Sequence, residues 1–345
     1  MLANVQRIRW CFCLTIALLA VVMSRAIWVA PRQFARAAEE PAATKSIDPA
    51  AWGTDHVGEP LPEYMESGEC LFCHRNEVGV TWGKNKHNRT IREAEPKEPA
   101  VIALRADPAA KEIAEQVELI MGDSRSNRFL KRAAAYGKLE MLSTGAVLSR
   151  TGRARLDRTD KLHWDAEIFA KECAGCHATA VDPETHAFAA LSLDCYTCHG
   201  DSPAEHANDP KMMPLAKVRH DSAAAVTSIC AQCHIRFGKS KSSGRPYPNN
   251  FVAGDNLFKD FQVDWALADD PKINPADRHV LDNVRNVVLH GQETMTCLSC
   301  HEVHIGSTKR HRDVPDQKYC LHCHEAGKSK KEHIPYEIHS SRCKY

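Results

Sequence analysis

Cys70-Leu-Phe-Cys-His74 is the first of six segments in which two cysteines flank two residues and histidine follows at once. The other five are Cys173-Ala-Gly-Cys-His177, Cys195-Tyr-Thr-Cys-His199, Cys230-Ala-Gln-Cys-His234, Cys297-Leu-Ser-Cys-His301 and Cys320-Leu-His-Cys-His324. This pattern is the attachment signature of c-type haem, because two thiols reach the two vinyl groups of one porphyrin while the adjacent imidazole binds its iron. The sequence therefore predicts six covalently bound haem c groups.

Each motif residue has a distinct expected role. The thioether positions are Cys70, Cys73, Cys173, Cys176, Cys195, Cys198, Cys230, Cys233, Cys297, Cys300, Cys320 and Cys323. The proximal iron ligands are His74, His177, His199, His234, His301 and His324. Zinc sites and disulfides also use paired cysteines, but neither explains a histidine directly after the second cysteine on every occasion.

The first 37 residues predict export. Arg7 and Arg9 precede an apolar run over residues 10–23, and Ala35-Arg-Ala37 has the form of a cleavage site. The alternative is a retained N-terminal membrane anchor, if the apolar run continues to Ala30. Thioether attachment of haem takes place outside the bacterial inner membrane. Motifs and signal therefore agree on a periplasmic or otherwise extracytoplasmic location.

The net charge and the use of cysteine limit which bonds and which binding partners are expected. Of 15 cysteines, twelve lie in the motifs, Cys11 and Cys13 lie in the apolar run, and only Cys343 remains, so no disulfide framework is expected. Without residues 1–37 the chain has 40 basic and 44 acidic side chains, and every haem adds two propionates. This balance disfavours nucleic acid and favours redox partner proteins, a donor and an acceptor, steered by complementary basic faces.

The length predicts a fold organised by its cofactors. The 308 residues after the signal provide about 51 per haem, too few for a separate apolar core around each. We expect a mainly α protein of short helices and long loops around stacked haems, with little β structure. Residues 38–62 predict an extended lead-in, and residues 63–345 a hexahaem domain. Motif spacings of 103, 22, 35, 67 and 23 residues predict one isolated haem, a cluster of three and a final pair.

Residues 88–165 form an insert without a haem motif. Ile113, Val117, Ile120 and Met121 fit one face of a helix that Gly122 would end. The one β element expected is a small hairpin at about residues 126–143, with its turn near Tyr136-Gly137. The insert would cover a haem.

Thirteen histidines remain for the six distal iron positions. That surplus predicts mostly bis-histidine haems, which suit electron transfer at low potential. On a helix His304 would share a face with His301, so it would ligate a neighbouring haem rather than its own. The candidate distal ligands are His87, His206, His290, His304, His333 and His339.

The motif contexts resemble a known family: the multihaem cytochromes c related to the tetrahaem cytochrome that accepts electrons from hydroxylamine oxidoreductase, a superfamily that includes nitrite-reductase-like enzymes. The resemblance spans roughly residues 64–324. It rests on Gly68-Glu-Cys-Leu-Phe-Cys-His74 with Trp82 and His87, Glu172-Cys-Ala-Gly-Cys-His-Ala-Thr179, Asp194-Cys-Tyr-Thr-Cys-His-Gly200 with His206, Ile229-Cys-Ala-Gln-Cys-His-Ile235 with Tyr247-Pro248 and Gly254-Asp255, and His290 before Cys297-Leu-Ser-Cys-His-Glu-Val-His304.

The resemblance implies stacked, mainly bis-histidine haems, service as an electron carrier, and distal roles for His87, His206, His290 and His304. Two departures matter. Six motifs exceed the four of the tetrahaem carrier, and the Cys-x-x-Cys-Lys site of pentahaem nitrite reductases is absent.

Three functions follow from these observations. The leading interpretation is a periplasmic respiratory carrier that transfers electrons between redox partners. The first alternative is an oxidoreductase that acts on a small nitrogen or sulfur compound at one open haem, and the sequence identifies no catalytic residue for it. The second alternative is a subunit of an extracellular haem filament.

Overall fold

We analysed a computed structural model of the chain, which describes residues 55–122, 125–157, 161–291 and 296–305. The predicted signal or anchor, residues 38–54 of the lead-in, the sixth motif (Cys320, Cys323, His324), His333 and His339 lie outside the described residues. Within the described ranges, no helix combines the length and apolarity needed to cross a membrane.

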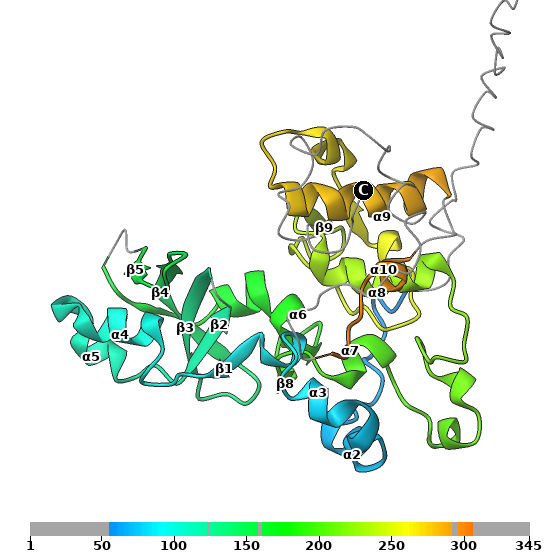
Figure 1. Cartoon of the computed structure of the whole chain (residues 1–345), viewed down its shortest axis with the longest axis horizontal. Coiled ribbons are helices and arrows are strands. Elements are labelled where there is room, and N and C mark those ends of the chain that lie inside the picture. Colours follow the sequence, from blue (N-terminus) through cyan, green and yellow to red (C-terminus); the bar gives the residue numbers. More distant parts are fainter. Residues whose placement is uncertain (1–54, 123–124, 158–160, 292–295, 306–345) are drawn as a thin grey trace, which may run out of the picture. The chain divides into compact units, whose positions relative to one another are not determined.

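Short helices and strands alternate along the described chain (Figure 1). The helices are α2 (Ser67–His74), α3 (Val80–Trp82), α4 (Pro99–Ala106), α5 (Lys111–Ala114), α6 (Ala174–His177), α7 (Cys195–His199), α8 (Ala223–His234), α9 (Pro275–His290) and α10 (Cys297–Cys300). The strands are β1 (Ile91–Glu93), β2 (Leu119–Gly122), β3 (Ser126–Arg132), β4 (Leu139–Leu148), β5 (Ala154–Leu156), β6 (Trp164–Asp165), β7 (Ala178–Val181), β8 (Phe188–Leu191), β9 (Gly238–Ser240) and β10 (Phe261–Val263).

A six-stranded antiparallel sheet occupies the haem-free insert, so the expectation of a mainly α fold with little β structure is wrong. Its order is β1-β2-β3-β4-β5, with β6 also paired to β4. The expected hairpin segments do pair, with Leu130 opposite Met141 and Arg132 opposite Leu139. They form only the centre of a larger sheet, and two-stranded sheets β7-β8 and β9-β10 follow.

The helix expected through Val117 to Gly122 is also wrong, because Leu119–Gly122 is strand β2. Leu119 and Met121 belong to one apolar core, and Ile120 belongs to another. A strand buried on both faces has consecutive apolar residues, and over a short run this pattern does not differ from one face of a helix.

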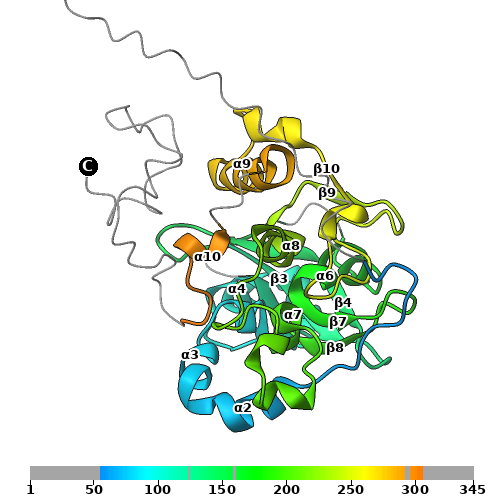
Figure 2. The same ribbon diagram turned by 90° about the vertical axis from the view of Figure 1, so that its right-hand side faces the viewer.

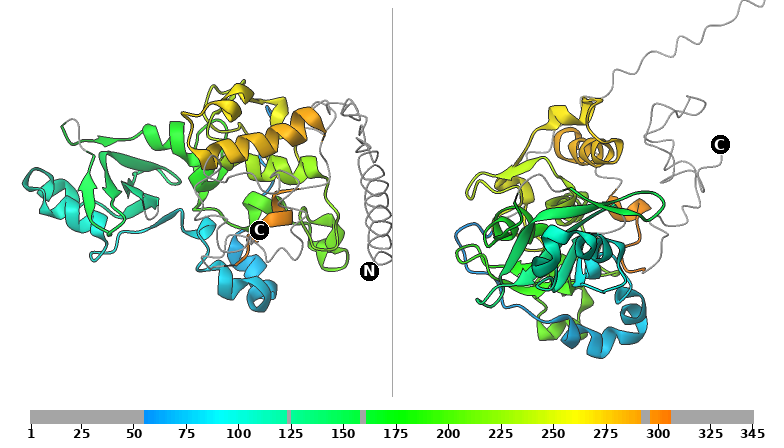
Figure 3. Two further views of the ribbon diagram at one scale, coloured as in Figure 1. Left: turned by 45° about the horizontal axis from the view of Figure 1, so that its top comes forward. Right: turned by 90° about the vertical axis from the view of Figure 1, so that its left-hand side faces the viewer.

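Each face of this sheet supports a separate core. On one face α4 packs through Val101 and Leu104 against Ile120 and Phe129, and Figure 3 shows α4 lying across the strands. On the other face, Leu130 and Met141 share a core with Phe169 and Ala174. Ala174 begins α6 and follows Cys173, so the sheet fixes the position of the second motif.

A third core joins α8 and α9, which lie side by side in Figure 2. It contains Ile235, Leu281, Val284 and Val288 among its buried residues. The ends of α9 follow capping rules: the Asn274 side chain accepts from the Ala276 backbone N–H, and Gly291 ends the helix with φ 64°. This core positions the fourth motif, at the end of α8.

Candidate haem-ligating site

All five described motifs lie on helical segments. The first and fourth end α2 and α8, the third forms α7, and the fifth begins α10. In the second motif, a π-helical turn (Phe169–Cys173) leads directly into α6. Side chains three residues apart share a helix face, so both cysteines of one motif are presented to the same porphyrin. None of these ten cysteines is in a disulfide.

Three proximal histidines face three of the expected distal ligands. The ring centroids of His74 and His206 are 6.5 Å apart. The separation is 6.1 Å for His87 and His234, and also 6.1 Å for His199 and His304. Two imidazoles that bind one iron from opposite sides have centroids about 6 Å apart, since each metal–nitrogen bond is about 2 Å and each nitrogen lies about 1 Å from its centroid. The three ring separations match this spacing.

Hydrogen bonds at Nδ1 leave Nε2 of four of these rings available. A metal-binding histidine commonly donates its other ring N–H to an oxygen, which fixes both tautomer and orientation. The Nδ1 partners are the Glu77 carboxylate for His74 at 3.1 Å, Asn85 Oδ1 for His87 at 3.2 Å, the Pro214 carbonyl for His199 at 2.6 Å and the Pro203 carbonyl for His206 at 2.7 Å.

Burial favours the metal-binding form of the imidazole. It lowers the pKa of His87, His199 and His304 below the ordinary value, which keeps these rings neutral. Neutral imidazole is the form that ligates iron. The donor atoms, the ring separations and the protonation state all fit haem c.

Asn85, which the sequence analysis did not single out, connects two distal candidates. Its buried side chain accepts from the His87 backbone N–H at 2.9 Å. Its amide Nδ2 donates to the carbonyls of Val303 and Ile305, the neighbours of His304. One asparagine thus orients the segments that carry His87 and His304. The sequence contains no signal for this role beyond the closeness of Asn85 to His87 in the chain.

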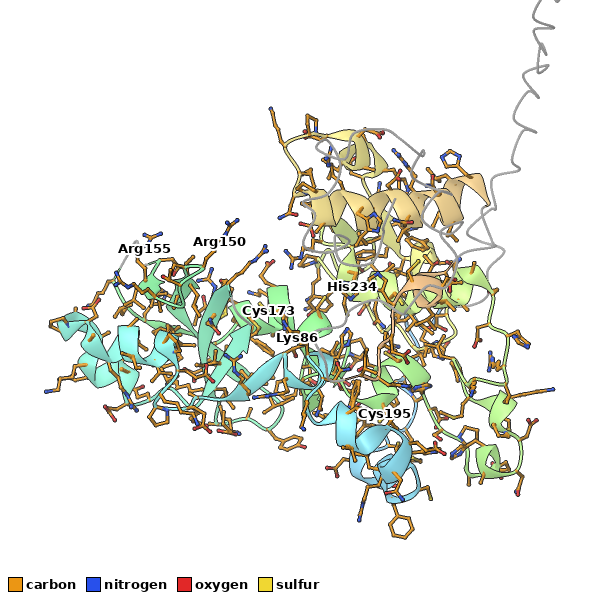
Figure 4. The ribbon with its side chains drawn as sticks, in the orientation of Figure 1. Lys86, Arg150, Arg155, Cys173, Cys195 and His234 are labelled. Carbon is orange, nitrogen blue, oxygen red and sulfur yellow. The ribbon has the colours of Figure 1, made fainter. Side chains whose placement is uncertain are left out.

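Contacts between the motif segments show which motifs are neighbours. The Cys176 thiol donates to the Gln232 carbonyl and the Cys233 thiol donates to the Gly175 carbonyl, both at 3.7 Å, so the second motif lies beside the fourth. The Gln232 side chain also donates to the Thr197 carbonyl of the third motif at 3.4 Å. Helix α2 contacts α7, and α10 contacts α8, so the first motif lies beside the third and the fifth beside the fourth. The fourth motif therefore adjoins the second, third and fifth. Figure 4 labels Cys195 and His234, which belong to two of these adjoining motifs.

His177 of the second motif differs from the three paired proximal ligands. Burial lowers its pKa to about 4, with the Arg236 charge acting in the same direction. Its buried Nδ1 has no hydrogen-bond partner among the described residues. Within the described part of the chain, none of the facing imidazole pairs includes His177.

The other two expected distal ligands with described positions, His290 and His304, differ in their outcome. His290 is the exposed last residue of α9, and it is in none of the three pairs. His304 faces His199, as expected for a ligand of a neighbouring haem. The helical reasoning for it was wrong, however, because α10 ends at Cys300 and His301 has extended backbone, φ −105° and ψ 142°.

Gly175 allows close packing beside the second motif. A Cβ at this position would overlap the ring of Tyr247, whose hydroxyl donates to the Ala170 carbonyl. We expect Gly175→Ala to reduce the free energy of unfolding by about 1–3 kcal/mol, because the ring has to move. Guanidinium denaturation of the holoprotein measures this. Gly68→Ala is the matched control, since nothing lies within 4 Å of its added Cβ. Equal stability of the two variants would contradict the packing described.

One comparison with known proteins agrees with a haem-binding chain. The family described as cytochrome c554 and c-prime matches residues 131–200, which include the second and third motifs. Among solved structures, the chain is similar to the undecaheme cytochrome from the S-layer of Carboxydothermus ferrireducens, with 16% identity and a TM-score of 0.41. That match covers 78% of this chain and 44% of the other. The search of curated proteins found no match.

Proposed function

We propose that this chain, a multihaem cytochrome c, transfers electrons between a donor and an acceptor protein through six haems that are mostly bis-histidine. Haem c supplies a one-electron iron couple, whose potential is low when both axial ligands are histidine. The polypeptide supplies spacing, ligation and exclusion of other ligands. This hexahaem unit corresponds to residues 63–345, with the sheet-forming insert at 88–165.

The observation that carries this proposal is the set of three facing histidine pairs. We assign His206 to the iron of His74, His87 to the iron of His234, and His304 to the iron of His199. Each distal residue comes from a segment next to a different motif, so ligation connects distant parts of the chain. An iron with histidine on both sides has no vacant position for a substrate, which favours a carrier.

Adjoining motifs support passage of electrons through the protein. Contacts between the motif segments connect the first motif to the third, the third to the fourth, and the fourth to both the second and the fifth. Electron transfer from a donor to an acceptor at a different place on the protein requires haems that are neighbours in a continuous series. Haems that each react independently would not require neighbouring motifs.

A comparison of turnover with electron exchange tests this proposal. The reduced holoprotein is mixed with hydroxylamine, nitrite or tetrathionate, and in parallel with a one-electron acceptor protein. We expect rapid oxidation by the acceptor protein and negligible turnover of the small molecules. Turnover near 10 per second, an ordinary enzymatic rate, would contradict the carrier function.

The second motif favours one alternative function. None of the facing pairs among the described residues includes His177, so an iron bound there would have a position for a small nitrogen or sulfur compound if no histidine outside the described ranges ligates it. Addition of nitrite or hydroxylamine to the ferric holoprotein tests this alternative by absorption spectroscopy. A shift of one haem's bands supports an enzyme, and unchanged spectra support the carrier.

Location outside the cytoplasm is part of the same proposal. The apolar run over residues 10–23 and the Ala35-Arg-Ala37 site support export, and covalent haem attachment supports it independently. Cleavage of the signal or its retention as an anchor can be distinguished by the N-terminal sequence of the mature protein.

A further inference from the structure

We propose that an arginine-rich edge of the six-stranded sheet is the docking surface for an acidic one-electron redox protein, with the haem of the second motif as the point of electron exchange. This inference rests on the proposed electron-transfer function and adds to it a surface and a partner of defined charge. The charge of the whole chain favours partners with basic faces, and this surface is a local exception that suits one acidic partner. The surface, termed the arginine edge, consists of Arg125, Arg150, Arg153 and Arg155.

The charge of this region is opposite to that of the rest of the chain. Residues 125–157 contain eight Lys or Arg and two Asp or Glu, a net charge of +6. The remaining residues contain 37 Lys or Arg and 42 Asp or Glu, a net charge of −5. Haem propionates make the remainder more negative still. An acidic partner is therefore attracted to this region and repelled elsewhere, which defines an orientation.

The carboxylates of the sheet are already paired with other cations. Arg128 pairs with Asp157 at 3.2 Å, and Lys131 pairs with Glu140 at 3.1 Å. Arg132 is shared between Glu93 and Glu118 at 2.8 and 2.7 Å. By contrast, none of the four arginines of the arginine edge forms an ion pair with a described residue, and all four are exposed.

Strand register gathers these arginines at one end of the sheet. The Arg125 carbonyl accepts from Leu148 N–H at 2.8 Å, and the Arg153 carbonyl accepts from Ser149 N–H at 2.8 Å. Arg155 pairs with Val147 across β4 and β5. Val147 is 39% exposed among them. An apolar side chain within a ring of arginines is a composition typical of protein interfaces. Figure 4 shows Arg150 and Arg155 near each other at this edge.

Of the five described motifs, the second is the one that packs against the six-stranded sheet. Cys173 and Ala174 share a core with Leu130 and Met141, which lie on the same strands, β3 and β4, as Arg128 and its partner Gly145. Arg128 pairs with Gly145, two residues along β4 from the partner of Arg155. At about 3.3 Å per residue, the arginine edge begins about 7 Å along the strand from Arg128. A partner held there would exchange electrons with the haem of Cys173 and Cys176.

Stopped-flow reduction of the ferric holoprotein by reduced flavodoxin, a strongly acidic one-electron donor, tests the inference. The variant is Arg150→Glu with Arg153→Glu and Arg155→Glu. The control has the same charge change at exposed lysines outside the insert: Lys84→Glu, Lys211→Glu and Lys217→Glu. We expect the second-order rate constant to fall about tenfold or more in the arginine variant at low salt, with the difference lost at about 1 M salt, where charges are screened.

Three results would overturn the inference. The arginine variant could retain the wild-type rate and salt dependence, or the lysine control could lose as much as the arginine variant. Alternatively, the arginine variant could lose binding to vesicles containing phosphatidylglycerol while its flavodoxin rate stays unchanged, which would assign the surface to a membrane. Full reduction of all three proteins by dithionite is measured in parallel. Failure at that step would count against the proposed function itself rather than against the docking surface.

Discussion

Replacing His206 with alanine is expected to leave every haem covalently attached and to convert one haem from low spin to high spin. His206 faces His74 at 6.5 Å, and its Nδ1 is hydrogen-bonded to the Pro203 carbonyl, so only Nε2 is available to an iron. Its loss leaves one axial position to water or to no ligand, which weakens the ligand field at that iron. Pyridine haemochrome analysis counts the haems, and electron paramagnetic resonance measures the spin states.

His220→Ala is the matched control for this prediction. His220 is exposed and belongs to none of the three facing pairs, so its removal should leave the spectrum unchanged. A wholly low-spin spectrum in the His206 variant would remove the assignment of this ligand. High-spin signals in both variants would mean that histidine loss disturbs the haems in a general way.

Replacing His87 with alanine should have the larger effect on electron flow. His87 faces His234 of the fourth motif, and that motif lies beside the second, third and fifth. Loss of one axial ligand changes the potential of a centre through which the other haems exchange electrons. Reduction by a protein donor should become biphasic, with the slow phase about tenfold or more slower than in wild type.

The His206 variant provides the comparison for this kinetic effect. Helix α2 of the first motif packs against α7 of the third, so we expect its haem to end the series. Loss of His206 should change the absorbance amplitude of that one haem. The other haems should still be reduced in a single kinetic phase. Equal disturbance by the two variants would contradict a central position for the fourth motif.

The haem-binding chemistry could be predicted from the sequence because it is local. Five consecutive residues contain both thioether positions and the proximal ligand, and a helical turn is sufficient to present them together. Distal ligands come from distant parts of the chain and depend on tertiary structure. The sequence could therefore suggest candidates but could not show which distal histidine belongs to which iron. His87, His206 and His304 do face proximal histidines, whereas among the described residues none of the three facing pairs includes His290.

The sheet could not be predicted for a different physical reason. Leu119, Ile120 and Met121 are all buried because β2 lies between two cores, and this removes the alternation that distinguishes a half-buried strand from a helix. The role of Asn85 depends on hydrogen bonds to Val303 and Ile305, more than 200 residues away. No local pattern could indicate that contact.

Low-temperature electron paramagnetic resonance of the ferric holoprotein, integrated against total haem, tests the central claim most directly. Spectra are recorded with and without nitrite or hydroxylamine. The carrier function predicts that at least the three haems with facing histidines are low spin and do not respond to either molecule. High-spin signals from those haems, or a response to ligand in more than one haem, would contradict the assignments on which the account depends.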